Sequence, residues 1–457
     1  MGTPLGSFSS SFDPKRASPD SHDRKRQMLA PPEIRPTVDF EHDGQRLLKH
    51  IRSEFGTATT SVVVPESDDH HSVWWRSYLE GKNLERVSGT ASPIRTVDLF
   101  CGPGGLSLGF GRGVHELGLT HQPLAAVDED AHALSVYAHN HRPRLTSSES
   151  VSMLVDYQVR GNAETASFVY EPELIDEAWV TLAGTVEAVV AGPPCQGHSN
   201  LNNHSRRSDP RNALYLTVPA IAVALGAPIV VIENVPSVLH DHSGVVQTAT
   251  KLLETSGYHI TAGVLHADKM GWPQRRQRYF LVARRDTQPI PLDVVAEALA
   301  SEERSVMWAI GALDQQDDRG YMTETAQLSD ENVRRIDWLF DNDEYDLTLH
   351  ERPDCHKDGT TYTSVYGRMY PDRPAPTITT GFFTPGRGRF THPTERRTIN
   401  AREAARLQGF PDTYRFSPRS DSTPPKLHLS KWIGDAVPMP LGYAAALSAL
   451  LPGAPTR

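Results

Sequence analysis

Residues 96–107 read Thr-Val-Asp-Leu-Phe-Cys-Gly-Pro-Gly-Gly-Leu-Ser, a short apolar strand that leads through a glycine-rich turn into a helix. Glycines in such a turn let the backbone approach a cofactor closely. A nicotinamide-binding turn would read Gly-x-Gly-x-x-Gly, and Ser107 occupies the last position, so that match is poor. The stretch predicts a strand–turn–helix unit of an open parallel sheet, in which ligands bind at the carboxyl ends of the strands.

A second apolar run, residues 186–191, leads into Pro-Pro-Cys-Gln-Gly-His-Ser at residues 193–199. The two prolines make a stiff turn directly before Cys195, at the carboxyl end of the predicted strand. This position suits a reactive thiol, because it lies at the ligand-binding edge of the sheet. Most free cysteines are buried small hydrophobes, and for Cys195 taken alone that interpretation stays open.

Two more apolar runs end on carboxylates. Residues 123–127 lead to Asp128, and a carboxylate at the end of the second strand can bind the ribose hydroxyls of an adenosine cofactor. Residues 229–232 lead to Glu233, followed by Asn-Val, at the edge that Cys195 faces. An ordinary strand–helix turn remains the alternative for each block by itself.

Three further blocks follow in the chain. They are Gln-Arg-Arg-Gln-Arg at residues 274–278, Arg-Glu-Ala-Ala-Arg-Leu-Gln-Gly-Phe-Pro at residues 402–411, and Gly-Asp-Ala-Val-Pro at residues 434–438. In this order the six blocks closely resemble the cytosine-C5 DNA methyltransferase family, over residues 93–450. Six ordered blocks are hard to attribute to chance, although no single block would justify the assignment.

The resemblance implies an α/β fold with a Rossmann-like S-adenosylmethionine methyltransferase sheet, a smaller target-recognition domain and an N-terminal extension. It implies a DNA (cytosine-5)-methyltransferase that transfers a methyl group from S-adenosylmethionine to C5 of a flipped-out cytosine in a specific duplex sequence. The product of the cofactor is S-adenosylhomocysteine, and no metal is needed. The reaction would pass through a covalent bond between Cys195 and C6 of the base.

The chemistry explains these residue types. C5 of cytosine is a poor nucleophile until a group adds at C6, and a cysteine thiolate suits that addition. Glu233, protonated or sharing a proton with ring N3, would relieve the charge that develops on the ring. By resemblance, Arg276 and Arg278 would hold the carbonyl oxygen of the base and the flanking backbone, with Arg276 favoured for the base.

The resemblance also assigns binding residues. Those expected at the cofactor are Phe100, Gly102, Gly104, Gly105, Asp128, Glu129, Pro194, Leu214, Asp435 and Val437. Those expected at DNA are Gln196, Ser199, Arg206, Arg207, Arg211, Arg387 and Arg389.

Three positions depart from the family pattern. His198 stands where phenylalanine is frequent, Asp435 where asparagine is usual, and Glu129 where an apolar or aromatic residue often covers the adenine. The acidic residue that normally reads the adenine amino group has no clear counterpart, and Asp156 or Asn162 are the candidates considered.

Composition agrees with this interpretation. The formal net charge is -10, so a DNA-binding surface has to be local. Residues 351–419 supply one, with twelve arginines and lysines against seven acids. The three cysteines are far apart and show no disulfide or zinc spacing, and histidine-bearing clusters at residues 69–71, 139–141 and 240–242 have no partner at metal-binding spacing. We therefore expect no metal.

No apolar run is long enough to span a membrane, and the N-terminus lacks a signal-peptide core. These features predict a cytoplasmic, nucleoid-associated protein with no membrane partner. The predicted partner is double-stranded DNA, bound by a monomer, together with a cognate restriction or defence-system protein.

The chain divides into five predicted parts. Residues 1–37 form a disordered tail, because their composition lacks periodic apolar spacing. Residues 38–92 form a small extension of unknown role, with a helical pattern at Leu47, Leu48 and Ile51. The third part is a catalytic and cofactor-binding domain at residues 93–285. The fourth is a target-recognition region at residues 286–381, where strand–helix alternation is lost. The fifth consists of C-terminal motifs at residues 382–457 that return to the large domain, with helices expected at 401–408 and 444–450.

Two other functions remain open. One is the same chemistry on tRNA, although the Cys-Phe-Thr signature of those enzymes is absent here. The other is a catalytically idle DNA-binding subunit, which the joint presence of Cys195, Glu233 and Arg276 argues against. The target sequence, and whether the role is restriction, phage defence or regulation, cannot be read from the chain.

Overall fold

The computed structural model describes residues 35–87, 92–194, 214–241, 243–313, 320–357, 364–417 and 423–452, without the side chain of Cys355. The following statements concern these residues, and those from Arg35 onward form one compact unit. Nearly all of the predicted N-terminal tail lies outside the described residues. So do Cys195, Gln196, His198, Ser199, Arg206, Arg207 and Arg211.

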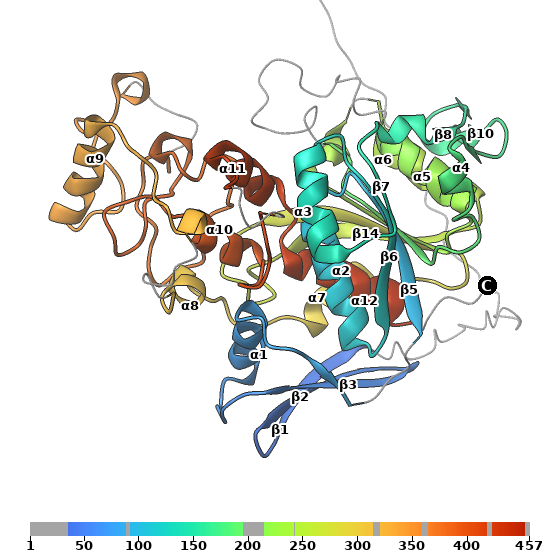
Figure 1. The fold of residues 1–457 in the computed structure, drawn as a ribbon, viewed down its shortest axis with the longest axis horizontal. Coiled ribbons are helices and arrows are strands. Elements are labelled where there is room, and N and C mark those ends of the chain that lie inside the picture. Colours follow the sequence, from blue (N-terminus) through green and yellow to red (C-terminus); the bar gives the residue numbers. More distant parts are fainter. Residues whose placement is uncertain are drawn as a thin grey trace, which may run out of the picture. The chain divides into compact units, whose positions relative to one another are not determined.

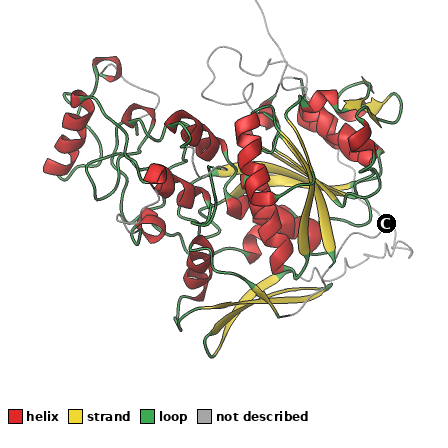
Figure 2. Ribbon diagram, viewed as in Figure 1, coloured by secondary structure: helices red, strands yellow, loops and turns green. Residues whose placement is uncertain are grey.

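A seven-stranded sheet carries the fold, with the strand order β14-β15-β13-β12-β5-β6-β7 (Figures 1 and 2). Its strands are β5 (Pro93–Leu99), β6 (Thr120–Val127), β7 (Leu145–Ser147), β12 (Ala188–Ala191), β13 (Ile229–Asn234), β14 (His259–His266) and β15 (Gln277–Arg284). The five strands from β13 to β7 in this order are parallel, whereas β15 runs antiparallel to both β13 and β14. The parallel strands confirm the predicted sheet and bring their carboxyl ends to one edge.

Helices cover both faces of the sheet, and alternate residues of each strand face opposite layers. Val190 of β12 packs in the cluster that contains α2 (Gly105–Glu116) and α12 (Met439–Leu450). Val189 packs on the other side, with α5 (Leu214–Leu225) and α6 (Val245–Thr255). A strand buried on both sides reads as a continuous apolar run, which is why the sequence revealed these strands.

The last helix packs tightly on the first helix of the large domain. Any side chain at Gly109 of α2 would collide with the backbone of α12. A Cβ at Gly442 of α12 would lie 2.8 Å from the carbonyl oxygen of Leu106. The C-terminal helix α12 therefore packs on α2, and it begins five residues earlier than expected.

The N-terminal extension is mostly β structure, so the predicted helical pattern is wrong. It consists of β1 (Thr37–Asp43), β2 (Arg46–Ser53), β3 (Gly56–Val63), β4 (Glu85–Arg86) and α1 (His70–Leu79). In β2 the buried residues alternate, as Leu47, Lys49 and Ile51 face the core. A lysine in the middle of this alternation hid the two-residue period from the sequence analysis.

An insertion separates β7 from β12. It contains short elements: β8 (Val155–Asp156), β9 (Val159–Arg160), β10 (Ser167–Phe168), β11 (Glu173–Leu174), α4 (Glu177–Val180) and the 3₁₀ turns Val151–Met153 and Ala163–Thr165. The β strands pair in two small antiparallel sheets, β8 with β11 and β9 with β10. Both lie against α5 or α6 rather than on the large sheet.

Beyond β15 the described chain forms no further named strand. Its helices are α7 (Leu292–Ala298), α8 (Val306–Ile310), α9 (Asp330–Asp341), α10 (Ala401–Gln408) and α11 (Lys426–Asp435), with 3₁₀ turns at Gly320–Met322, Asp354–His356 and Pro385–Arg387. Strand–helix alternation thus ends after β15, and the helix expected at 401–408 is α10. One apolar cluster joins α8, α10 and α11 with residues such as Ile378 and Phe390.

Candidate active site

The glycine turn sits between β5 and α2 at the carboxyl edge of the sheet. Phe100, Gly102 and Gly104 have positive φ angles of 56°, 51° and 98°. A side chain at Gly104 would collide with His141, and Gly104 also caps the N-terminus of α2. The backbone therefore needs glycine here, and it bends as a cofactor-binding turn requires.

Asp128 ties the turn to the next strand. Its carboxylate accepts hydrogen bonds from the backbone N–H of Gly102 at 2.7 Å and of Asp130 at 2.8 Å. Burial raises the pKa of Asp128, and these backbone donors oppose that shift. A carboxylate oxygen can accept more than one hydrogen bond, so Asp128 keeps capacity for a ligand hydroxyl. The neighbouring Glu129 is exposed.

Asp98 is a buried carboxylate of the site that the sequence analysis missed. Ser107 donates a hydrogen bond to it, and the Ser107 hydroxyl lies 3.0 Å from that of Tyr137. Burial raises the pKa of Asp98 to about 7. These contacts fix the first turn of α2 against β5. An acid inside an otherwise apolar strand was the available signal.

The ends of β12 and β13 meet beside the position of the predicted nucleophile. The side-chain amide of Asn234 donates to the carbonyl oxygen of Pro193 at 3.3 Å, and its oxygen accepts from the backbone N–H of Val235 at 2.8 Å. Asn234 thus clamps the two-proline turn from the next strand. Pro194 is the last described residue before Cys195.

Glu233 precedes Asn234 at the carboxyl end of β13, and it is 7% exposed. The Arg278 Nε atom is 2.8 Å from Glu233 Oε1. Burial raises the pKa of Glu233, while Arg278 and then Arg276 act in the opposite direction. Glu233 is therefore a carboxyl group that can hold a proton near neutral pH more readily than an exposed glutamate.

Arg276 and Arg278 have different surroundings. Arg276 is 3% exposed and donates to the carbonyl oxygens of Ile378 and, at 3.0 Å, Gly434. Arg278 is the arginine paired with Glu233. The contacts of Arg276 join segments far apart in the sequence, and its predicted contact with the base remains a prediction.

Two buried glutamines, Gln274 and Gln408, add further hydrogen bonds between these distant segments. Gln274 donates to the carbonyl oxygen of Leu407 at 2.8 Å and to Gln408 Oε1 at 3.0 Å, and it accepts from the N–H of Ile378 at 2.9 Å. Gln408 donates in turn to the carbonyl oxygen of Ile433 at 2.5 Å. The 274–278, 402–411 and 434–438 blocks therefore form one hydrogen-bonded unit behind the site.

The last block also reaches the glycine turn. A Cβ at Gly105 would lie 2.8 Å from the carbonyl oxygen of Val437, so the two segments are in direct contact. Lys431 of α11 lies 3.7 Å from carboxylate oxygens of both Asp130 and Asp435. The structure thus brings together the expected cofactor residues of the glycine turn, of Asp128 and of the C-terminal block.

Other predicted residues lie elsewhere or have other partners. Leu214 begins α5 at the edge of the described chain. Arg387 is exposed. Arg389 is engaged within the protein, because it donates to Asp346 at 2.5 Å and to the carbonyl oxygens of Tyr345 and Arg368. Their contacts with cofactor or DNA remain predictions.

The two candidates for reading the adenine lie in the insertion. Asp156 accepts a hydrogen bond from Tyr170 at 3.0 Å, and Asn162 caps a 3₁₀ turn. By contrast, Glu149 is exposed and follows β7, whose last residue, Ser147, accepts a hydrogen bond from the N–H of Asp128 at 3.2 Å. Glu149 thus lies just beyond the carboxyl end of β7, next to the strand that leads to Asp128, and the three-residue length of β7 hid this position from the sequence analysis.

One group of possible metal ligands occurs among the described residues, His392, Glu395 and Glu403. The guanidinium group of Arg397 already forms ion pairs with both carboxylates of this cluster, 2.6 Å from Glu403 Oε1 and 2.8 Å from Glu395 Oε2. The donor set is therefore neutralised by an internal cation, and it gives no positive indication of a metal.

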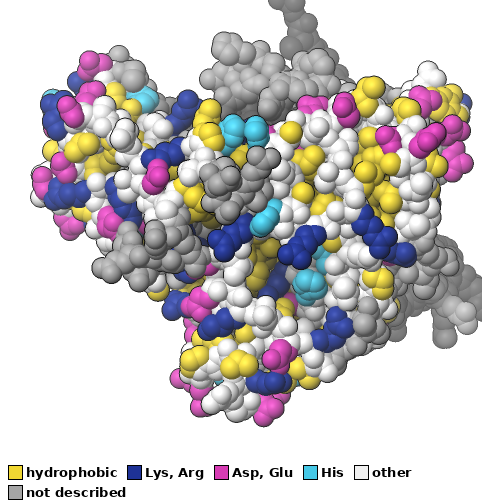
Figure 3. Space-filling model, in the orientation of Figure 1, with side chains coloured by type: hydrophobic (Ala, Val, Ile, Leu, Met, Phe, Trp, Pro, Cys, Tyr) yellow, Lys and Arg dark blue, Asp and Glu magenta, His cyan; other side chains and the backbone are white. Residues whose placement is uncertain are grey.

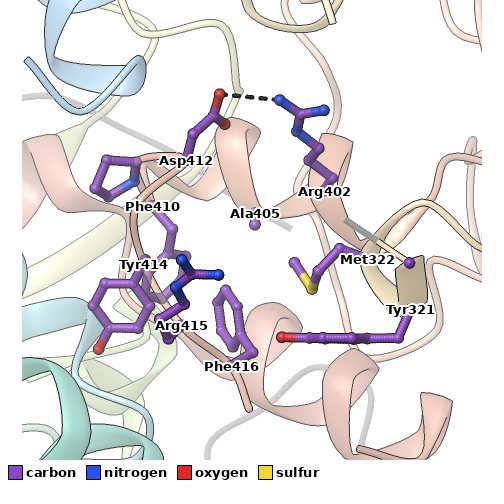
Figure 4. A pocket seen from close by; sticks show the side chains of 11 residues that line it. Tyr321, Met322, Arg402, Ala405, Phe410, Asp412, Tyr414, Arg415 and Phe416 are labelled. Atoms are coloured by element: carbon purple, nitrogen blue, oxygen red, sulfur yellow. Dashed lines mark hydrogen bonds and ion pairs between the residues drawn. The ribbon is translucent and has the colours of Figure 1, made fainter. Parts of the chain in front are cut away.

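A cavity of about 310 Å³ lies against α10 and the chain that follows it (Figure 4). Figure 4 shows Arg402 and Asp412 paired at its wall, with Tyr414 and Phe416 nearby. No residue predicted for catalysis, cofactor or DNA lines this cavity. Tyr414 nevertheless links it to the site, because its hydroxyl donates to the carbonyl oxygen of Pro103 in the glycine turn.

None of the described helices is long and apolar enough to cross a membrane.

Comparisons with known proteins place these features in a family. The model of C-5 cytosine-specific DNA methylases matches residues 94–449. The Type II methyltransferase M1.BsuMI of Bacillus subtilis is 38% identical over 419 residues, covering 90% of this chain and 95% of that protein. The Type II methylase M.HgiDII of Herpetosiphon aurantiacus is 32% identical over 364 residues, covering 77% and 94%.

Solved structures share the fold. A prophage-encoded DNA modification methyltransferase from E. coli superposes with a TM-score of 0.52 at 25% identity, covering 78% of this chain and 98% of that one. The Dnmt2 methyltransferase of S. pombe gives 0.51 at 16% identity over the same shares of the two chains. The chain therefore belongs to the C-5 cytosine-specific DNA methylase family and is a DNA (cytosine-5)-methyltransferase.

Proposed function

We propose that the protein methylates C5 of a cytosine flipped out of a specific duplex DNA sequence, through a covalent bond between Cys195 and C6 of the base. The observation that supports this most is the ion pair of the buried Glu233 with the half-buried Arg278, beside the Asn234–Pro193 clamp. The clamp holds Pro193, two residues before Cys195, at the end of the strand next to the one that carries Glu233.

The residues act on the base in a fixed order. The Cys195 thiolate adds to C6 while Glu233 donates to, or shares a proton with, ring N3, so that the ring becomes an enamine. Arg278 holds Glu233 in place and balances its charge after the proton has moved. C5 then accepts a methyl group, its proton leaves to a base, and the carbon–sulfur bond breaks to release Cys195.

S-adenosylmethionine supplies the methyl group from its sulfonium centre. The site fits this cofactor, because the positive φ angles of the turn expose backbone and Asp128 has unused acceptor capacity. We assign the ribose hydroxyls to Asp128 and the adenine amino group to Glu149. The other expected contacts come from Phe100, Pro194, Leu214 and Val437.

Flipping requires DNA contacts around the site. We assign them to the polar, arginine-bearing residues 196–212, which lie outside the described part, and to the exposed Arg387. Base specificity is assigned to residues 286–381. The few kcal/mol needed to unstack the base would be offset by these contacts.

The Type II names of the relatives favour a role in restriction–modification, with a cognate restriction enzyme as partner in the same system. We place the enzyme in the cytoplasm, associated with the nucleoid, and acting as a monomer on DNA. At 16% identity, the likeness to the S. pombe methyltransferase concerns the fold alone.

Transfer of tritium from methyl-labelled S-adenosylmethionine tests the proposal. The purified protein is incubated with duplex DNA from a host that lacks the modification, or with total tRNA. Label in DNA, removed by Cys195→Ala, is expected. Label in tRNA, or in neither nucleic acid, would contradict the proposed substrate.

A further inference from the structure

A second hollow lies between the N-terminal extension and the large domain. Its volume is about 420 Å³, and it is lined by residues of β3, α1, β4, α2 and the turn that contains Pro411 and Thr413. No residue predicted for catalysis, cofactor or DNA lines it. We call it the extension pocket.

The lining of the extension pocket is basic. Lys82, Arg86 and Arg112 contribute cationic side chains, and the lining contains no carboxylate. His115 also lines the pocket, but burial and then Arg112 lower its pKa, so it adds no charge near neutral pH. This contrasts with a chain whose net charge is -10. Figure 3 shows Lys, Arg and His side chains gathered over α2 and its junction with the extension.

Arg112 is buried at the inner wall with incomplete hydrogen bonding. It is 8% exposed, and its Nε donates to Glu116 at 2.6 Å. Its Nη2 atom is buried and has no hydrogen-bond partner among the described residues. A buried guanidinium with an unsatisfied donor costs free energy unless an acceptor is supplied.

Another buried arginine of the same protein, Arg406, has hydrogen-bond acceptors for all three of its guanidinium nitrogens. Arg406 donates from Nε and Nη2 to the carboxylate of Asp412, at 2.9 and 2.6 Å, and from Nη1 to the carbonyl oxygen of Ala309 at 2.9 Å. Arg112 has a carboxylate on one side only. Arg112 lines a pocket that is large enough to hold the acceptor that its Nη2 atom lacks.

A second unsatisfied group lines the same pocket. Thr60 of β3 is 1% exposed, and its hydroxyl has no partner among the described residues. Threonine hydroxyls and arginine donors are frequent partners of phosphate oxygens. The unsatisfied donors of Arg112 and Thr60 come from the two sides of the pocket, the large domain and the extension.

The two basic side chains at the mouth are weakly held. Lys82 Nζ lies 3.0 Å from the carboxylate of the exposed Glu80, and Arg86 donates at 3.3 and 3.4 Å to the Leu119 carbonyl oxygen and the Thr120 hydroxyl. Exposed ion pairs and long hydrogen bonds are easily exchanged. Both groups can therefore turn to an anion that enters.

We propose that the extension pocket binds a phosphate group, with Lys82 and Arg86 at the mouth and Arg112 and Thr60 at the inner wall. The phosphate belongs either to a small phosphorylated molecule or to the backbone of DNA. This inference does not depend on the proposed function.

Binding to the purified full chain tests the proposal, with pyrophosphate as one probe and a duplex oligonucleotide as the other. The variant Lys82→Ala/Arg86→Ala should bind at least one probe ten or more times more weakly, as measured by calorimetry or fluorescence anisotropy. Thr60→Val, which removes only the hydroxyl from a group of the same shape, should weaken the same probe. Lys269→Ala is the matched control, because Lys269 also forms an exposed ion pair, 2.8 Å from Glu303.

Weaker pyrophosphate binding by the double variant identifies a small phosphorylated ligand, whereas weaker binding of the duplex alone identifies the DNA backbone. The proposal is overturned if neither probe is weakened, or if Lys269→Ala weakens binding as much as the double variant. Thermal melting of each variant without probe shows that it is folded, and no readout requires methylation activity.

Discussion

Lys49 of the N-terminal extension lies 2.7 Å from Glu116 at the carboxyl end of α2, with both side chains almost completely buried. Glu116 also accepts hydrogen bonds from Trp74 at 2.9 Å and Tyr443 at 2.6 Å. The ammonium group of Lys49 is 4.6 Å from the centre of the Trp75 ring. The extension is thus bound to α2 and α12 through the Lys49–Glu116 ion pair and its hydrogen bonds, which lie among aromatic side chains.

We expect Lys49→Met to destabilise the protein by about 3 kcal/mol, because it leaves Glu116 as a buried charge without its main partner. Urea unfolding followed by circular dichroism measures the loss. The double variant Lys49→Met/Glu116→Leu should not regain wild-type stability, since it removes the Lys49–Glu116 pair but leaves the buried Arg112 without its carboxylate partner. A single variant as stable as the wild type would show that the pair does not hold the extension.

Acid should weaken the same cluster. Burial alone would raise the pKa of Glu116, but Lys49 and Arg112 bring it down to about 2, below the ordinary value of 4.5. A depressed pKa stabilises the folded state above the unfolded pKa, and that stabilisation is lost as the pH falls from about 4.5 towards 2. Glu116→Gln should lack this component, so the difference in unfolding free energy between wild type and variant should shrink over that range. A constant difference would contradict the assignment.

Arg276 and Arg278 should respond differently to substitution by lysine. Arg276→Lys shortens the side chain whose Nη1 donates to the carbonyl oxygens of Ile378 and Gly434, so we expect a lower melting temperature. Arg278→Lys changes the partner of Glu233, so we expect a fall in kcat of about tenfold or more with a nearly unchanged melting temperature. Methylation rates and melting curves of both variants check this. The opposite pattern would mean that Arg276 contributes more to the reaction and Arg278 more to stability.

The different contacts of Arg276 and Arg278 could not be predicted from the sequence. Both stand in one alternating basic block, and what separates them is contact with Ile378 and Gly434, about 100 and 160 residues further on. The strands were predictable because doubly buried strands such as β12 are continuous apolar runs. The strand β2 was not, because Lys49 interrupts its buried positions, and its partner Glu116 is visible only in the folded chain.

Specificity should move with residues 286–381. Grafting this segment into a related enzyme should transfer the methylated sequence, as read by methylation-sensitive sequencing of the host DNA. The segment shares an apolar cluster with α10 and α11, so the graft should keep the residues that face Ala404 and Ile433. An active chimera that retains its old target would exclude this segment as the reader.

Deleting residues 1–34 should leave methylation nearly unchanged, because their composition offers little apolar surface to bury. A loss above about tenfold, or about 1.4 kcal/mol, would mean that the segment contributes to the enzyme. Deleting residues 1–87 should instead prevent stable folding, since it removes Trp74 and Trp75 from the core and leaves Glu116 without Lys49. Expression yield and melting temperature distinguish the two truncations.

The nucleophile is tested by removing one sulfur atom. If Cys195 bonds to C6, Cys195→Ala should abolish methyl transfer while DNA and S-adenosylmethionine still bind. Duplex DNA with 5-fluorocytosine at the target should trap the wild-type enzyme, because fluorine at C5 blocks the proton loss that frees the cysteine. Cys101 is the internal control: it is buried, and burial raises the pKa of its thiol well above the ordinary range, so it is a poor source of thiolate. Cys101→Ala should still form the adduct, provided that the variant is folded. Peptide mapping that places the adduct on Cys101 or Cys355, or turnover by Cys195→Ala, would remove Cys195 from the mechanism.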